Sequence, residues 1–598
     1  MGGPALLLGV LARPLFFTNA QDWLGHLWIL WHQSLTIRAN HLPSLFLHYP
    51  HSVFYPEYAF YGGTLYALGG TLSLLLGDAP LATYIATYCL AFMAAYGGWY
   101  WMGRMAGLGR CQAQIPGVIL ITSASYLTIV YARGEWLEFL AVSAMPLMIA
   151  ATLSIVYSDR LRIWPALALT GSCVVFCGSH NMTLLWGSTV LAMLGLAVIV
   201  CVPQARDEIT GRRVLRVVSL MVPALLVSAW FLLPELAYSS HIFAGSGYGG
   251  GSHYWQDSLQ KYMYTVSVKS LFALERSIVQ PGSIYFLTLP VAAIVWVLAA
   301  TAILLRAGSR GPWARVLLIL IGMAVLIGLV MTHKGLILAL PTPYTVLQFS
   351  FRLESYVLLT VSGAVLVALV LAKRSDARRV GLWRWMLLPV LILSVIGAVR
   401  QLSAYPHELV RRETAMSSYL KPLLPAGGAN RQLLDFYYVG APTLSHSGKA
   451  ANVYFPPTAV HGDRASVTVR LRPGEFVTSN VASGPELVHI TGARIVGVSQ
   501  DGNDVLQIDP EPRRAATARK RQAASWKTIS LSPAHPLPVV LGRLLTLIGV
   551  VALAGRLIAL AAFRRRPAPR WRRATVPPPH APPRGRPRAR ARRRRRLP

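Results

Sequence analysis

Long apolar runs dominate the chain and alternate with polar connections of two kinds. A helix of about 20 apolar residues spans the ~30 Å hydrocarbon layer and satisfies its own backbone hydrogen bonds, which lipid cannot do. The pattern predicts about twelve such spans, at residues 3–18, 80–102, 113–131, 139–157, 162–179, 182–203, 214–234, 283–305, 314–332, 353–372, 383–399 and 537–562. We therefore expect an all-α polytopic membrane protein.

The connections indicate which side of the membrane each one occupies. One set is short and basic, at residues 104–110, 159–162, 206–216, 306–315 and 373–384. The other set is longer, aromatic and rich in Gly, Pro and His, at residues 18–79, 132–138, 235–282, 333–352 and 400–536. The positive-inside rule puts the basic set in the cytoplasm. With twelve spans, both termini lie in the cytoplasm. The expected location is a bacterial-type cell membrane.

Two segments interrupt this simple alternation. Residues 61–77 (YGGTLYALGGTLSLLLG) are apolar but rich in glycine and flanked by aromatics, which favours a helix lying in the interface within the first exterior loop. Residues 400–536 are polar, and their period-two stretches ASVTVRLR (465–472), ELVHITGARIVGVS (486–499) and DVLQID (504–509) predict a small extracytoplasmic β-rich domain. The predicted domains are 1–399, transmembrane; 400–536, β-rich; 537–563, last helix; and 564–598, tail.

Composition supports this class and limits its partners. Hydrophobic residues make up 54% of the chain and charged residues 13%, against about 25% charged residues in soluble domains. The net charge of +34 is concentrated at the end, because residues 564–598 hold fifteen Arg and no acid. This Arg/Pro-rich tail directly follows the last apolar run, which predicts a disordered cytoplasmic segment that contacts anionic lipids rather than nucleic acid.

Acidic residues follow two of the predicted spans on the exterior side. Asp22 comes directly after the first span, and His26 lies on the same face of the aromatic amphipathic stretch that follows. At a helix start, Asp22 is either an N-cap or a reactive carboxylate. The loop YARGEWLEF after the third span carries Arg133, Glu135 and Glu138, which are either anchoring charges or part of a carboxylate site.

Basic residues and histidines lie at the same predicted surface. His180 separates the fifth and sixth spans, Lys334 follows the ninth, and Arg352 leads into the tenth. Arg and Lys at such positions can bind a phosphate, Arg through two parallel hydrogen bonds. The alternative for Arg352 is an ion pair with Glu354 or snorkelling towards water. The histidine spacings match no metal-ligand motif, so no metal is assigned and a divalent cation at the acidic cluster is left open.

Taken in this order, the residues resemble the GT-C superfamily of membrane glycosyltransferases. The shared features are DWLGHL, FYPEYAFYGGTLY, RGEWLE, SHN (179–181) and QFSFR, within roughly residues 15–360. The likeness is strongest to bacterial membrane proteins with a 6-pyruvoyl-tetrahydropterin synthase-related domain and to YfhO-like proteins. It implies transfer of a sugar from a polyprenyl-phosphate donor to an extracytoplasmic cell-envelope acceptor.

The resemblance also implies roles for single residues. Asp22 corresponds to the acid that follows the first span in the superfamily, and Arg133 with Glu138 to an Arg followed five residues later by an acid. Asp22 would be the general base, Glu138 would position the acceptor or a cation, and His26, Glu135 and His180 would contact substrate. Arg352, with Lys334 or Arg133, would bind the donor phosphate. The alternatives are a transporter or flippase for a lipid-linked substrate, and a non-catalytic envelope-assembly protein.

Overall fold

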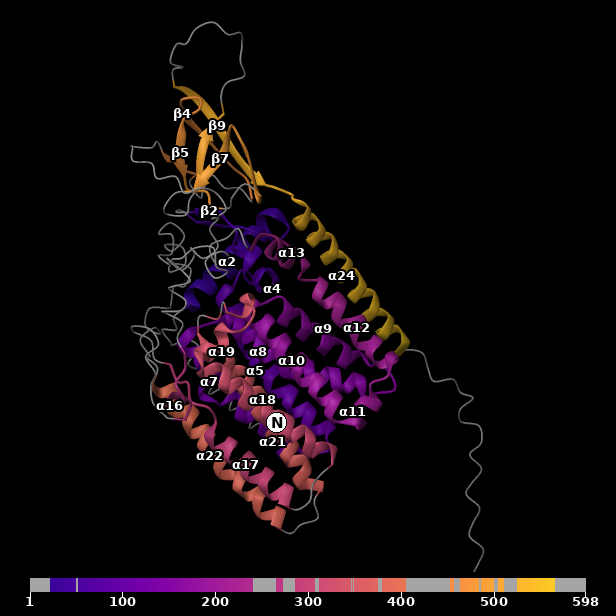
Figure 1. Cartoon of the computed structure of the whole chain (residues 1–598). Coiled ribbons are helices and arrows are strands. Elements are labelled where there is room, and N and C mark those ends of the chain that lie inside the picture. Colours follow the sequence, from indigo (N-terminus) through magenta and orange to yellow (C-terminus); the bar gives the residue numbers. More distant parts are fainter. Residues whose placement is uncertain are drawn as a thin grey trace, which may run out of the picture.

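A body of long helices carries a small β region at one end in the computed structural model (Figure 1). The structure describes residues 22–49, 52–239, 265–272, 285–306, 311–345, 347, 349–374, 379–404, 452–455, 463–482, 486–498, 504–509 and 524–564. The predicted first span at 3–18, the Gly-rich stretch 245–253 and nearly all of the Arg-rich tail lie outside these residues. Among the described residues the fold is mainly helical, as the apolar runs predicted.

Seven helical segments in the described part of the chain are long and apolar enough to cross a membrane. They are α5 (Pro80–Met105), α8 (Trp136–Val156), α10 (Asn181–Cys201), α18 (Pro312–Thr332), Ser350–Arg374 with α21 (Glu354–Arg374), Leu387–Ala404 in α22 (Arg379–Ala404), and most of α24 (Leu537–Arg564). Two further pairs of helices are bent. If each bent pair counts as one span, the number of candidate spans among these residues rises to nine. They are α6 (Arg110–Ile121) with Ala124–Arg133, at 52°, and α12 (Gly211–Leu226) with α13 (Ala229–Tyr238), at 68°.

Twelve membrane crossings thus stay a prediction. The eleven predicted spans that fall on described residues each coincide with a helix or a bent pair. Two of these helices, α9 (Ile163–Cys177) and α17 (Val291–Arg306), have only 15 and 16 residues. They are therefore shorter than a perpendicular span of about 20 residues requires.

The first loop packs into the helical body instead of lying over it. It contains α2 (Trp23–Asn40), the hairpin of β1 (Leu47–Tyr49) and β2 (Ser52–Tyr55), α3 (Glu57–Phe60) and α4 (Gly63–Leu75). α4 is the helix that the glycine-rich segment predicted. α2 is not the amphipathic helix expected from its sequence, because its polar side chains His26, His32, Gln33 and Ser34 are also buried. Each of these side chains has a hydrogen-bond partner, as buried polar groups require.

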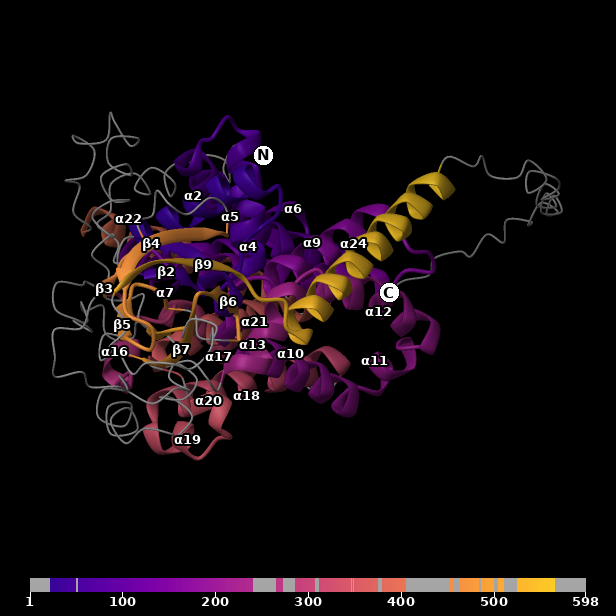
Figure 2. The ribbon, with the colours of Figure 1, turned by 90° about the horizontal axis from the view of Figure 1, so that it is seen from above.

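The β region forms two small sheets within the described residues, and the predicted strands are confirmed. One sheet has the order β3-β5-β8-β7 and the other the order β4-β9-β6. The strands are β3 (Asn452–Val453), β4 (Ala465–Leu471), β5 (Phe476–Ser479), β6 (Val488–Thr491), β7 (Ala493–Val498), β8 (Asp504–Ile508) and β9 (Ser525–Pro533). From β9 the chain enters α24, which runs along the outside of the helical body past α13 and α12 (Figures 1 and 2).

The helices α8 and α21 form the centre of the body. About 94% of the apolar window of α21 and 67% of that of α8 are buried by other helices. α5 and α9 pack against α8, and α18 and α17 pack against α21. Side chains at the first turn of α8 and directly before α21 therefore enter a crowded, water-poor interior, where charged groups need partners.

Candidate functional site

A sharp turn joins η2 (Ile129–Arg133) to α8 and builds the floor of the site. η2 is a π-helical turn that ends at Gly134, whose φ of +69° is left-handed. A Cβ on Gly134 would lie 2.6 Å from the Trp23 backbone nitrogen, so only glycine fits there without a shift. The turn makes Glu135 the N-cap of α8 and puts Glu138 in its first turn. Arg133, Glu135 and Glu138 thereby point into one small volume.

The same turn positions Asp22 at the start of α2. The backbone N–H of Asp22 donates to the Arg133 carbonyl at 2.8 Å. Asp22 occupies the expected N-cap position of α2, but its side chain makes no capping hydrogen bond. In the described part of the chain its Oδ1 atom is buried without a hydrogen-bond partner. Burial, reinforced by the charge of Glu135, raises the pKa of Asp22 to about 6, although His26, Arg133 and Arg352 act in the opposite direction.

Arg133 forms a bidentate ion pair with Glu138. Its two terminal nitrogens donate to the two carboxylate oxygens at 3.0 and 2.6 Å. A third carboxylate oxygen, from Glu135, lies 3.4 Å from the same guanidinium. All three residues are at least 94% buried, so these contacts supply the neutralisation that buried charges require.

Arg352 contacts the same two carboxylates from a different part of the chain. It lies in η4 (Ser350–Leu353), a 3-10 turn that directly precedes α21. Its Nη2 donates to Glu135 at 3.2 Å, and its Nε lies 3.7 Å from a Glu138 oxygen. The expected alternative, an ion pair between Arg352 and Glu354, is not among the contacts of the described residues. Glu354 instead lines a small cavity that adjoins the site and is also lined by Arg133 and Glu138.

His180 completes this side of the site as a neutral acceptor. Arg352 Nη1 lies 2.9 Å from His180 Nε2. His180 Nδ1 caps α10 by accepting from the Thr183 backbone N–H at 3.2 Å, and the Thr183 hydroxyl lies 3.0 Å from the same nitrogen. Burial and the charge of Arg352 lower the pKa of His180 to about 4, which agrees with a neutral ring.

Glu135 is held from the first loop as well. The Tyr61 hydroxyl donates to its Oε2 at 3.3 Å, and His26 Nε2 lies 3.5 Å from the same oxygen. The other His26 nitrogen meets the Tyr66 hydroxyl at 2.6 Å. Burial by itself would raise the pKa of Glu135, but the His26 hydrogen bond and the charges of Arg352 and Arg133 hold it well below its usual value. Glu135 is therefore ionised and contacts Tyr61, His26, Arg133 and Arg352.

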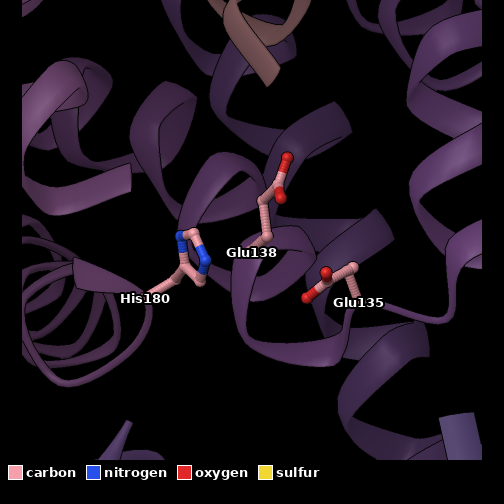
Figure 3. Close-up of side chains that lie close together, drawn as sticks. All are labelled: Glu135, Glu138 and His180. Atoms are coloured by element: carbon pink, nitrogen blue, oxygen red, sulfur yellow. The ribbon is translucent and has the colours of Figure 1, made fainter. Parts of the chain in front are cut away.

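A metal ion does not fit this arrangement. Glu135, Glu138 and His180 each offer a ligand atom, and these atoms lie within 4.8 Å of one another (Figure 3). Arg352, however, already bonds to Glu135 and to His180 Nε2, while Arg133 uses both oxygens of Glu138. Two guanidinium groups thus balance two carboxylates, and a cation would first have to displace Arg352.

The structure brings seven of the eight residues expected from the sequence into one neighbourhood, namely Asp22, His26, Arg133, Glu135, Glu138, His180 and Arg352. Lys334 begins α19 (Lys334–Leu338), and no described contact links its side chain to the cluster. Sequence reasoning did not assign Tyr61 or Tyr66 to the site, although both lie in the aromatic stretch FYPEYAFYGGTLY. Their spacing along the chain alone gave no reason to choose them among many aromatics.

Comparison with known proteins gives partial likenesses in structure. No protein-family model matches the chain, and no curated protein matches its sequence. It is similar to arabinofuranosyltransferase AftD from mycobacteria, with a TM-score of 0.40, 17% identity, and coverage of 67% of this chain and 26% of that one. It is also similar to the Archaeoglobus fulgidus oligosaccharyltransferase in the apo form, with a TM-score of 0.39, 11% identity, and coverage of 75% and 62%. A complex of that enzyme, AglB, with an inhibitory peptide and a dolichol-phosphate scores 0.36 at 14% identity, with the same coverage. The chain thus spans about a quarter of AftD and three fifths of the oligosaccharyltransferase.

Proposed function

We propose that this protein is a membrane glycosyltransferase that moves a sugar from a polyprenyl-phosphate carrier to a cell-envelope acceptor outside the cytoplasm. The observation that carries the proposal is the Asp22 carboxylate, which in the described part of the chain has a buried oxygen without a partner beside a charge-balanced Arg–Glu cluster. A carboxylate with a pKa of about 6 is half ionised near pH 6 and is a stronger base than an ordinary aspartate.

In the proposed reaction Asp22 accepts the proton of the acceptor hydroxyl. The acceptor oxygen attacks the anomeric carbon, the bond from that carbon to the phosphate oxygen breaks, and the polyprenyl phosphate leaves with the bonding electrons. A direct attack of this kind inverts the anomeric configuration. Glu138 is bound through both oxygens by Arg133, so its role is to hold Arg133 and Arg352 rather than to accept a proton.

Arg352 is the best candidate to stabilise the leaving phosphate. Its side chain is 16% exposed, against 4% for Arg133, and its Nε–H has no hydrogen-bond partner among the described residues. Arg133 is fully occupied by Glu138 and the Phe351 ring, whose centroid lies 5.0 Å from its guanidinium carbon. Lys334 follows α18 and would act on the carrier outside the cluster. A preorganised donor aimed at developing charge stabilises the transition state.

The placement of the charges favours an enzyme over a transporter or flippase. The acidic and basic groups of the site gather where helices begin, at the starts of α2, α8 and α10 and directly before α21. A carrier phosphate lies at the membrane interface, so a site at helix ends can reach it. Transporters more often carry charged groups at the membrane midplane. Bent helices, which transporters also contain, are present here and do not discriminate between the two functions.

Sugar transfer by isolated membranes tests the proposal. Membranes that contain the wild-type protein or Asp22→Asn are incubated with a panel of radiolabelled polyprenyl-phosphate sugars, and label in the acceptor fraction is counted. We expect one donor to label the acceptor in the wild-type sample. Asp22→Asn should lower the rate of labelling by at least about 100-fold, as removal of a general base does. Asp159→Asn, at a side chain that is 99% exposed, is the matched carboxylate control. Undiminished transfer by Asp22→Asn overturns the assignment.

A further inference from the structure

The β region is fastened to the first loop by a buried polar joint. Asp463, two residues before the start of β4, accepts hydrogen bonds from the Ser44 hydroxyl at 2.6 Å and from His48 Nε2 at 3.2 Å. Next to it the backbones pair, because Val53 N–H donates to Asn480 at 2.6 Å and the Val53 carbonyl accepts from Ala482 at 3.2 Å. A single parallel bridge between Val53 and Val481 therefore links the hairpin β1–β2, which is a two-stranded sheet of its own, to the β region.

The hydrogen bonds indicate which ring nitrogen of each histidine in this joint acts as the donor. His48 Nδ1 accepts from the Phe54 backbone N–H at 3.1 Å, so its proton is on Nε2 and is donated to Asp463. His32 Nε2 accepts from the His48 backbone N–H at 3.1 Å, so its proton is on Nδ1 and faces the Tyr58 hydroxyl at 3.2 Å. Burial lowers the pKa of His32 to about 3 and keeps its ring neutral.

Two routes lead from this joint to Glu135. In the first, the hairpin continues through α3 to Tyr61, whose hydroxyl donates to Glu135 at 3.3 Å. In the second, the Tyr58 ring packs edge-on against Tyr66 with 5.7 Å between ring centroids, Tyr66 holds His26 at 2.6 Å, and His26 contacts Glu135 at 3.5 Å. Both routes end on the same carboxylate oxygen, Oε2.

We propose that Asp463, far away in the sequence and outside the helical body, is a positioning residue that sets the place of Glu135 through His48, the hairpin and Tyr61. This inference rests on the proposed function for its kinetic consequence. The structural part of the inference is that loss of the Asp463 contacts makes Tyr61 and Glu135 more mobile. This part does not depend on the proposed function. Packed side chains and hydrogen bonds that have two discrete arrangements can carry such coupling.

The test compares Asp463→Ala with Asp463→Asn, which keeps an oxygen acceptor for Ser44 and His48. Asp509→Ala is the matched control, because Asp509 follows β8 in the same region and is exposed. Amide hydrogen exchange of the full-length protein in detergent is followed at Tyr61 and Glu135, whose N–H groups bond to Glu57 and Ile129. We expect faster exchange at both amides in Asp463→Ala, and exchange close to wild type in the other two variants.

The pH dependence of the transfer rate distinguishes a positioning role from a simple loss of stability. If Glu135 shifts away from Asp22, it raises the pKa of Asp22 less, so we expect the acid limb of the rate to move to lower pH in Asp463→Ala and in Glu135→Gln. We also expect Asp463→Ala to lower kcat by about 2- to 30-fold with KM unchanged. In a Glu135→Gln background, Asp463→Ala should cause little further loss of kcat.

The outcomes separate the two proposals. If wild-type membranes transfer no sugar, the proposed function fails, whereas the exchange result still decides the positioning role. If Asp463→Ala leaves exchange at Tyr61 and Glu135 unchanged, the positioning role is overturned whatever the sugar transfer. Full additivity of Asp463→Ala and Glu135→Gln in kcat also overturns it.

Discussion

Arg133 and Glu138 are joined by two hydrogen bonds of 3.0 and 2.6 Å in the buried centre of the site. The five-residue spacing brings them together only because the chain turns at Gly134 between η2 and α8. Arg352 adds its charge from η4, so the carboxylates and guanidinium groups of the cluster form one network. Removal of any member leaves the buried network with an unbalanced charge.

The first prediction concerns the stability of this pair. Glu138→Leu leaves the Arg133 charge buried, and we expect a loss of about 3–5 kcal/mol in the free energy of unfolding. Thermal unfolding in detergent measures the loss. The double variant Arg133→Met/Glu138→Leu removes both charges and should recover a large part of it. Glu208→Gln breaks the exposed pair with Arg213 and should cost at most about 1 kcal/mol. Equal losses in Glu138→Leu and Glu208→Gln would contradict the argument.

The second prediction is a pH dependence of sugar transfer. Asp22 must be ionised to act as a base, and its pKa is about 6. Below that pH the carboxylate is protonated and inactive, so the rate per protein should rise as the pH increases and reach half its plateau near pH 6. Initial rates measured across this range at saturating donor check the claim. A midpoint near 4, about the value of an ordinary aspartate, would show that Asp22 is not the base or is not buried.

The third prediction concerns divalent cations. Arg352 bonds to two of the three side chains that could hold an ion, so we expect EDTA to leave the transfer rate unchanged within about twofold. Arg352→Ala frees Glu135 and His180, and the purified variant should bind Mn²⁺ that the wild type does not bind, measured by calorimetry. Lys334→Ala, at a residue without a described contact to the cluster, is the control for general loss of positive charge. Loss of wild-type activity in EDTA and its recovery with Mg²⁺ or Mn²⁺ would contradict this account.

The helices could be predicted from hydrophobicity, whereas their bends and depths could not. Apolar runs locate α8 and α21 because a helix in lipid needs a continuous run of that length. They do not show the 52° bend at residues 122–123, between α6 and Ala124–Arg133, nor the π-helical turn that ends at the left-handed Gly134. Nor do they show that α2 is buried on most sides, because its polar side chains find partners in segments distant along the chain.

The site could be predicted in outline from topology. Loop alternation placed Asp22, Glu138 and Arg352 on one predicted surface, and the structure brings them together. The pairing pattern could not be predicted, because Arg352 pairs with Glu135, 217 residues away along the chain, rather than with the neighbouring Glu354. The contact between His48 and Asp463 joins positions 415 residues apart, and a single sequence carries no signal for such a pair.

The fourth prediction concerns the turn at Gly134. A left-handed φ costs a non-glycine residue about 1–2 kcal/mol, and at Gly134 a Cβ would also approach the Trp23 backbone to 2.6 Å. Gly77 provides a matched control, because its φ is +80° but no described atom lies within 4 Å of the point that an alanine Cβ would occupy. Gly77→Ala should therefore lose only the cost of the backbone conformation, whereas Gly134→Ala should lose more and should also displace Asp22, which hydrogen-bonds to Arg133 beside the turn. Thermal unfolding and sugar transfer are measured for both variants. Equal stability and equal transfer in the two alanine variants would show that the Trp23 contact does not hold the site together.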